Sequence, residues 1–360
     1  MEPIWAVGCM SGTSLDGVDA ALLRTDGEDI RAFGRSTYRP YTENERRVLH
    51  QALGAWPGEP SVAMATEVIE AAHLEVLSGF PEAEIIGFHG QTLAHAPNEG
   101  RTHQAGNGAA LAAALRRPVV WDFRSADVAL GGEGAPLAPI FHAACARWIK
   151  ATAPLAFLNL GGVGNLTWID PQCDALLAFD TGPANAPMDD IMLASTQGRF
   201  DKNGAHAAQG QVDRSLIKEA LSHPFYGRIP PKSLDRTELY SSLISIRALP
   251  LEDALATLVA LITESVAIAL DHCPGPVRQV LVTGGGRKNA TLMRALAGRL
   301  TGTDFQSVEA VGLDGDMLEA QAFAYLAVRV LRGLPTSFPT TTGVAAEVGG
   351  GQISRPKALP

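Results

Sequence analysis

The stretch that decides the fold is GCMSGTSLDGVDAALLRTDG, residues 8–27. It places glycines, hydroxyls and two aspartates between two apolar segments, 4–10 and 18–25, which both predict strands. Backbone N–H groups in a tight turn form an anion-binding concavity, and glycine lets a ligand approach that backbone closely. The stretch therefore indicates a phosphate-binding turn, against the alternative of a tight hairpin turn that holds no ligand.

Composition limits the classes of protein to consider. A chain of 360 residues predicts about two domains, and 46% hydrophobic with 19% charged residues is ordinary for a globular protein. A formal net charge of −9 argues against nucleic acid or an anionic membrane as the main partner. Four scattered cysteines without a C-x-x-C pair, and no signal peptide, predict a cytoplasmic protein. The apolar segment 252–272 carries several hydroxyls and Glu264, so we expect a core helix and not a membrane span.

The strand–glycine turn–strand pattern occurs twice. After helical periodicity in 43–56 and 61–80, a buried strand within 83–97 runs into a polar loop. The pattern then restarts in LAFLNLGGVGNLTWID, residues 155–170, and 175–183 predicts a further strand. Two such halves predict duplicated α/β domains, with a boundary near Pro139, where a helix begins after a glycine-rich segment.

The second half ends in three more recognisable segments. Residues 277–300 predict a strand, a triple-glycine turn and a helix, and 315–333 a strong helix. Asp316 and Glu319 at the start of that helix have the spacing of a capping box. Residues 334–343, rich in proline and threonine, predict a surface connection.

Two matched glycine turns, at 10–17 and 161–165, together with the 284–286 turn between a strand and a helix, favour nucleotide binding over tight turns that hold no ligand. Ser11, Thr13 and Ser14 would add hydroxyl donors, and Asp16 and Asp19 could hold Mg²⁺ or its waters. Neither a P-loop nor G-x-G-x-x-G occurs in the sequence. The nine histidines do not cluster as metal ligands, so we expect no zinc site.

These motifs resemble those of the sugar kinase/actin/Hsp70 superfamily and, more narrowly, of the anhydro-N-acetylmuramic acid kinase family. The specific stretches are SGTSLDGVD, HGQT followed by a histidine, DFRSADVALGGEGAPL and FDTGPAN, in family order along nearly the whole chain. The resemblance implies an α/β fold of two duplicated ribonuclease-H-like (actin-like ATPase) domains around a nucleotide cleft. We place these domains at 1–138 and 139–345, with a tail, 346–360, that packs back on the first domain.

The resemblance also implies roles for individual residues. ATP would be bound by three turns, with Mg²⁺ as its companion ion: Gly12, Thr13, Ser14, Leu15, Asp16, Gly17, Val18 and Asp19 at the phosphates, Gly161, Gly162, Gly164 and Asn165 facing them, and Gly284, Gly285 and Gly286 near the adenosine. Asp180 matches the catalytic aspartate, and Glu319 a carboxylate that contacts the sugar. The chain departs from the family pattern at Leu234-Asp235, where Thr-Gly is usual, and at Glu133, where Gln is usual.

The residues by themselves leave alternatives open. Asp180 could act at a strand end or cap its own turn, and Glu319 could bind sugar or complete the helix cap. His89, Gln91 and Thr92 could orient a sugar or satisfy loop backbone, whereas we expect a structural role for His95. Arg124 and Asp127 could meet a substrate carboxylate or the other domain, or pair with each other.

The activity implied is ATP-dependent phosphorylation of the amino sugar 1,6-anhydro-N-acetylmuramic acid, giving N-acetylmuramic acid 6-phosphate for cell-wall recycling. We expect Asp180 to deprotonate a water that attacks carbon 1, because the bridging 6-oxygen carries no proton. The rival functions are a kinase of another anhydro or open sugar, such as levoglucosan, and an ATP-gated binding protein with little catalysis. The family also implies a homodimer.

Overall fold

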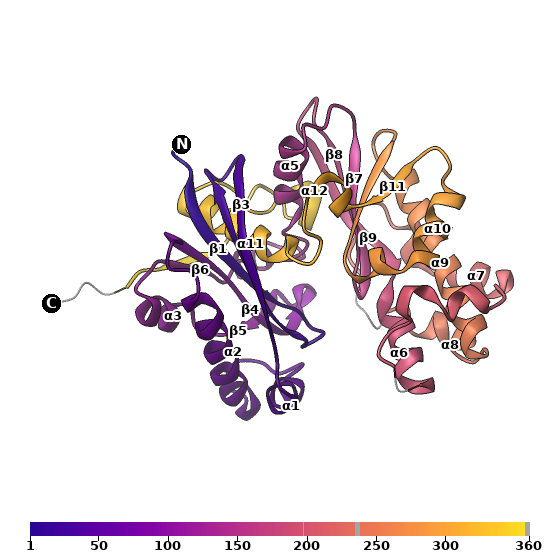
Figure 1. Ribbon diagram of the computed structural model, residues 1–360, viewed down its shortest axis with the longest axis horizontal. Helices are drawn as coiled ribbons and strands as arrows, with labels where there is room; N and C mark the ends of the chain where they lie inside the picture. The colour runs from indigo at the N-terminus through magenta and orange to yellow at the C-terminus, as the bar shows by residue number, and fades with distance from the viewer. Residues whose placement is uncertain (197, 235–237, 357–360) are drawn as a thin grey trace. The chain divides into compact units, whose positions relative to one another are not determined.

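The computed structural model describes residues 1–196, 198–234 and 238–356. The chain forms two compact units. The first unit holds Met1–Trp148 and the chain from Met317 onward, and the second unit holds Ile149–Asp316 (Figure 1). Each unit is built on its own mixed β-sheet.

The sheet of the first unit has the strand order β12-β6-β4-β1-β2-β3, with β5 paired to β4. Its strands are β1 (Ile4–Ser11), β2 (Gly17–Thr25), β3 (Ile30–Pro40), β4 (Ile85–Ala96), β5 (Arg101–Ala105), β6 (Val119–Trp121) and β12 (Gln352–Ser354). Strands β1, β2 and β3 are antiparallel neighbours, whereas β4 runs parallel to β1 and β6 runs parallel to β4. The α-helices of this unit are α1 (Glu43–Gln51), α2 (Pro60–Ser78), α3 (Gly108–Leu115), α4 (Ser125–Ala129), α5 (Pro139–Trp148), α11 (Leu318–Leu331) and α12 (Pro339–Thr342).

The second unit repeats this topology. Its sheet has the order β9-β8-β7-β10-β11, which matches β3-β2-β1-β4-β6 of the first unit. The strands are β7 (Leu155–Leu160), β8 (Val163–Asp170), β9 (Ala175–Pro183), β10 (Gln279–Thr283) and β11 (Asp304–Ser307). Again three antiparallel strands are followed by two parallel ones. The shared order confirms the predicted duplication and the two-domain α/β fold class.

Helix α9 (Leu251–Asp271) forms the centre of the second unit. The other α-helices of this unit are α6 (Asn185–Ser195), α7 (Arg214–Leu221), α8 (Ile244–Arg247) and α10 (Ala290–Arg299). By length and composition α9 could cross a membrane, but 72% of its most apolar window is buried inside the protein. Leu255, Leu258 and Ile262 join the main apolar cluster of the unit. The burial of these residues confirms the predicted core helix.

Helix α11 lies directly on the sheet of the first unit, and two glycines make this approach possible. A Cβ atom on Gly8 would lie 2.0 Å from the Ala320 carbonyl oxygen, and one on Gly87 would lie 2.1 Å from that of Phe323. Figure 1 shows yellow α11 beside indigo β1. The helix therefore packs through backbone contact, which no larger residue at these two positions would allow.

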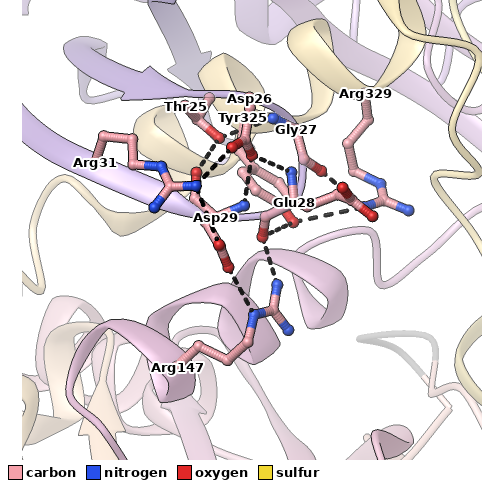
Figure 2. Close-up of polar contacts among 9 residues, drawn as sticks. All are labelled: Thr25, Asp26, Gly27, Glu28, Asp29, Arg31, Arg147, Tyr325 and Arg329. Carbon is pink, nitrogen blue, oxygen red and sulfur yellow. Dashed lines mark hydrogen bonds and ion pairs between the residues drawn. The ribbon is translucent and has the colours of Figure 1, made fainter. Parts of the chain in front are cut away.

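Helices α5 and α11 belong to the first unit, which corrects the predicted boundary near Pro139 and the assignment of 317–345 to the second domain. The ring of Phe141 on α5 lies 5.6 Å from that of Tyr325 on α11. Both helices also hold the turn between β2 and β3 (Figure 2). Arg329 donates to the Gly27 carbonyl at 2.8 Å, and Arg147 donates to the Asp29 carboxylate at 3.2 Å. The boundary between the units is set by contacts between segments that are distant in the sequence. The local composition near Pro139 could therefore not predict it.

Two local predictions at the C-terminal side are wrong. Helix α11 begins at Leu318 after Met317 and has no side-chain cap, because Asp316 instead pairs with Arg287 at 2.9 Å and Lys288 at 2.8 Å. Residues 334–343 are not a surface connection, since four of their hydroxyl side chains are buried: Thr336, Ser337, Thr341 and Thr342. The strand β12 in the predicted tail pairs with β6 of the first unit.

Candidate functional site

The candidate residues of the first unit gather at one edge of its sheet. Strands β1, β4 and β6 are parallel, so their carboxyl ends lie at the same edge. The 12–16 turn follows β1, His89 and Gln91 lie where β4 passes that edge, and Arg124 comes three residues after β6. Ligands of open α/β sheets bind at such an edge.

The 12–16 turn is fixed through its backbone. Leu15 is a non-glycine residue with a left-handed φ of 55°, and its N–H donates to the Gly12 carbonyl at 3.1 Å. The buried Gln91 side chain donates to the same carbonyl at 3.1 Å. Leu15 and Val18 are buried, so they could meet a nucleotide only through their backbone, whereas Thr13, Ser14 and Asp16 are exposed. The turn thus presents its backbone and short polar groups to solvent.

Seven of the eight glycines of the predicted nucleotide turns fall into two classes, and Gly285, whose Cβ would lie 3.0 Å from Asn185 Nδ2, stands between them. A Cβ on Gly17, Gly164, Gly284 or Gly286 would come within 2.6 Å of protein atoms, so the fold itself requires these four. Gly12, Gly161 and Gly162 have no left-handed φ, and a Cβ on any of them would stay 3.6 Å or more from the described protein atoms outside its chain neighbours. Neither backbone conformation nor packing requires glycine there. Open space at these three positions therefore favours a ligand that approaches the backbone over the simple-hairpin alternative.

Replacing Gly12 by alanine should therefore separate ligand binding from folding. We expect Gly12→Ala to keep the wild-type unfolding temperature and to weaken ATP binding about tenfold or more, because the new methyl would occupy space needed by the phosphates. Calorimetric titration with a non-hydrolysable ATP analogue measures this. Gly302→Ala, where a Cβ would meet no protein atom within 4 Å, is the control outside the turns. Unchanged affinity in Gly12→Ala would remove this turn from the nucleotide site.

His89 and Arg124 form a hydrogen-bonded pair at the same edge. Arg124 donates from Nε at 3.1 Å and from Nη2 at 3.0 Å to Nε2 of His89, and from Nη1 at 2.6 Å to the Gly134 carbonyl. Burial, with the charge of Arg124, holds the pKa of His89 well below its usual range. Burial also lowers the pKa of Arg124 to about 10, so the arginine stays charged at neutral pH beside a neutral histidine.

The neighbouring polar residues mainly contact protein. Thr92 accepts a hydrogen bond from Gln104 at 3.3 Å, and His95 contacts the Thr102 hydroxyl and the Glu133 carbonyl, both at 2.9 Å. Asp127 is fully buried and accepts from the Gly134 N–H and from two hydroxyls: Ser337 Oγ at 2.5 Å and Thr342 Oγ1 at 2.7 Å. These contacts give Asp127 a structural role.

Glu319 lies in the first turn of α11 and is exposed to solvent. The protein around it removes part of its hydration and so raises the pKa of Glu319, an effect that the charge of Arg124 partly offsets. Phe323, one turn further along α11, has its ring 4.6 Å from that of His89, so the start of this helix lies near the His89–Arg124 pair. Because Asp316 does not cap α11, a helix cap no longer explains the carboxylate.

In the second unit, Asp180 and two glycine turns gather at the corresponding edge. Strands β7 and β10 are parallel, so the turns that follow them, at 161–162 and 284–286, adjoin each other. Asn185 joins them to α6, because its side chain donates to the Leu160 carbonyl at 2.8 Å. Asp180 lies opposite Asn165 in the β8–β9 ladder, and its carboxylate accepts from the Leu234 N–H at 2.8 Å. The structure thus brings the predicted residues of this half together.

Lys232 is a further candidate site residue, next to Asp180, that sequence reasoning missed. Its side chain is buried, and its Nζ donates to the Phe225 carbonyl at 3.2 Å. Burial and the charge of Arg228 lower its pKa, whereas the charge of Asp180 raises it. The Lys232 carbonyl also accepts from the Asp180 N–H at 2.9 Å. In the sequence, the one feature that marks Lys232 is its place after two prolines. Asp235, one of the nearby departures from the family pattern, lies outside the described residues.

Within the described ranges, no group of three or more His, Cys, Asp or Glu side chains could hold a metal ion. Mg²⁺ in nucleotide enzymes is usually held by one or two carboxylates together with the substrate phosphates and water. Asp16, the exposed last residue of the 12–16 turn, and Asp19, half-buried in β2, are of the right chemical type. These two carboxylates therefore fit a Mg²⁺ ion that binds together with the phosphates of ATP.

Comparison with known proteins covers nearly the whole chain. The family model described as anhydro-N-acetylmuramic acid kinase matches residues 5–355. The chain is 60% identical to the anhydro-N-acetylmuramic acid kinase of Cereibacter sphaeroides, with 99% of this chain and 97% of that protein covered. It is 58% identical to the one of Roseobacter denitrificans, with 98% and 95% covered. Among solved structures it is similar, at 14% identity and a TM-score of 0.45, to the activator of the 2-hydroxyisocaproyl-CoA dehydratase from Clostridium difficile with bound ADPNP, with 92% and 96% covered. Because the family model and the two relatives match nearly the whole chain, the chain belongs to the anhydro-N-acetylmuramic acid kinase family.

Proposed function

We propose that this protein opens the 1,6-anhydro bridge of 1,6-anhydro-N-acetylmuramic acid by hydrolysis and phosphorylates the 6-oxygen with ATP. The products are N-acetylmuramic acid 6-phosphate and ADP. Family membership supports the substrate and the kinase class. The observation that carries the chemistry is the position of Asp180. Its strand pairs with the one that follows the 161–162 turn, where neither packing nor backbone conformation requires glycine.

The bridge explains why the base must act on water. The 6-oxygen of a 1,6-anhydro sugar lies in an acetal and has no proton to give up. Asp180 takes a proton from water, and the water oxygen bonds to carbon 1 while the bond from carbon 1 to the 6-oxygen breaks. The released 6-oxygen bonds to the γ-phosphorus, and the bond from that phosphorus to ADP breaks. The proton on Asp180 then passes to solvent.

The remaining residues bind and orient the two substrates. In this proposal the 12–19 and 161–165 turns bind the phosphates through their backbone, and the 284–286 turn lies near the adenosine. Arg124 pairs with the carboxylate of muramic acid, and Glu319 accepts from sugar hydroxyls. Asp16 and Asp19 hold Mg²⁺ or its waters, and the ion neutralises phosphate charge when it is bound.

Isotope labelling separates this reaction from simple phosphoryl transfer. In oxygen-18 water, we expect one labelled oxygen at carbon 1 of the sugar phosphate, measured by mass spectrometry of product quenched before anomeric exchange with the solvent. Exchange of authentic N-acetylmuramic acid 6-phosphate under the same conditions is the control. Product without label would refute hydrolysis of the bridge and favour a kinase of an open sugar. No ADP release with any anhydro or open amino sugar would favour an ATP-gated binding protein.

We also propose a cytoplasmic homodimer whose partners are small molecules. The net charge of −9 supports the absence of nucleic acid and anionic membrane among its partners. Light scattering of the purified chain tests the dimer.

A further inference from the structure

The contacts of Arg124 leave one edge of its guanidinium available. A guanidinium carries five N–H groups. Donation from Nε and Nη2 to His89, and from Nη1 to the Gly134 carbonyl, uses three of them. Among the contacts of the described residues, one N–H on each terminal nitrogen remains without an acceptor. Two such N–H groups match the two oxygens of a carboxylate.

His89 is itself held so that it can only accept from Arg124. Its Nδ1 lies 2.8 Å from the Gly90 carbonyl oxygen, which cannot donate, so Nδ1 carries the proton and Nε2 the lone pair. The side chain is only 2% exposed, and its ring lies 4.6 Å from the ring of Phe323. Gly90 has a φ of 75°, and a Cβ there would lie 2.6 Å from the Ala105 carbonyl oxygen, so the backbone that carries this acceptor is held as well.

We infer that His89 is a positioning residue: it holds the Nε–Nη2 edge of Arg124 so that the adjoining Nη1–Nη2 edge binds the substrate carboxylate, and it does not contact the sugar itself. This inference rests on the proposed function, which supplies the carboxylate of muramic acid. Of the two roles that the sequence left open for His89, it excludes direct binding of the sugar. The single lone pair of Nε2 is directed to Arg124, and burial leaves the rest of the ring in contact with protein.

The test measures the preference for a charged substrate. The probes are 1,6-anhydro-N-acetylmuramic acid and its neutral carboxamide, and the readout is the ratio of their kcat/KM values. We expect the wild type to prefer the acid by about 10²-fold, as a buried charge pair allows. His89→Met, which removes the acceptor, should reduce this preference about tenfold through KM. His89→Gln, whose amide oxygen can replace Nε2, should keep it within about threefold.

The outcomes distinguish the inference from the function on which it rests. If Arg124→Met keeps the acid preference, Arg124 does not bind the carboxylate. The role proposed for Arg124 and the positioning role of His89 then both fail. If Arg124→Met abolishes the preference and His89→Met leaves it intact, only the positioning role is overturned. Equal losses in His89→Met and His89→Gln, with both variants folded, would also overturn it. Should the variants unfold, nitrogen-15 NMR of the wild type still decides, because a proton on Nε2 at neutral pH would contradict the inference.

Discussion

An Asp180→Asn variant should bind ATP as the wild type does and lose turnover by about 10²–10⁴-fold, the usual contribution of a general base. Asparagine has nearly the same shape and can still accept from the Leu234 N–H, which donates at 2.8 Å to the carboxylate. It cannot take a proton from water. Turnover is measured as ADP release with the anhydro sugar, and nucleotide affinity by titration with a non-hydrolysable ATP analogue.

The matched control lies at the other end of the same strand. Asp174 precedes β9 (Ala175–Pro183) with a left-handed φ of 52°, a conformation that asparagine adopts as readily as aspartate. Asp174→Asn should therefore leave turnover and unfolding temperature unchanged. Near-normal turnover in Asp180→Asn would refute its role as base. Loss of nucleotide binding in that variant would instead assign Asp180 to holding ATP and its ion.

The local parts of the site could be predicted because they depend on short-range chemistry. A glycine-rich turn between two apolar strands is visible in residues 8–27 and again in 155–170, and each does join two strands in the structure. Helix α9 could be predicted for the same reason, since apolar residues on all its sides indicate burial. The residues of each unit then come together by topology, because parallel strands bring their carboxyl ends to one edge of a sheet.

The parts that were missed depend on contacts between distant segments. Strand β3 (Ile30–Pro40) has several exposed residues and lies at the sheet edge, so its apolar pattern is weak. Asp316 has the spacing of a cap, but the buried Arg287 competes for it. The pairing of His89 with Arg124 joins residues 35 positions apart. In each case local propensity gives way to a tertiary contact that a single sequence does not display.

The largest effect on stability is expected for Gly8→Ala, because a methyl there would meet backbone on two sides. Its Cβ would lie 2.0 Å from the Ala320 carbonyl oxygen and 2.2 Å from the Ala324 nitrogen, both in the first half of α11. Neither atom can move unless the helix shifts off β1 and opens the core beneath it. Overpacking costs about 1–3 kcal/mol, and more where backbone must move, so we expect a loss of at least about 3 kcal/mol. Scanning calorimetry should show the unfolding temperature lowered by roughly 6–12 °C.

The same substitution at Gly298 should act in the opposite direction. Gly298 lies in α10 (Ala290–Arg299), and a Cβ there would meet nothing within 4 Å. Alanine stabilises a helix interior relative to glycine by roughly 0.5–1 kcal/mol, so Gly298→Ala should raise the unfolding temperature slightly. If alanine were simply not tolerated in place of glycine, both variants would unfold at a lower temperature than the wild type. The packing of α11 on β1 predicts instead that Gly8→Ala lowers the unfolding temperature and Gly298→Ala raises it. If Gly8→Ala is as stable as the wild type, α11 does not lie against β1 at that distance, and the placement of Glu319 at the sheet edge fails with it.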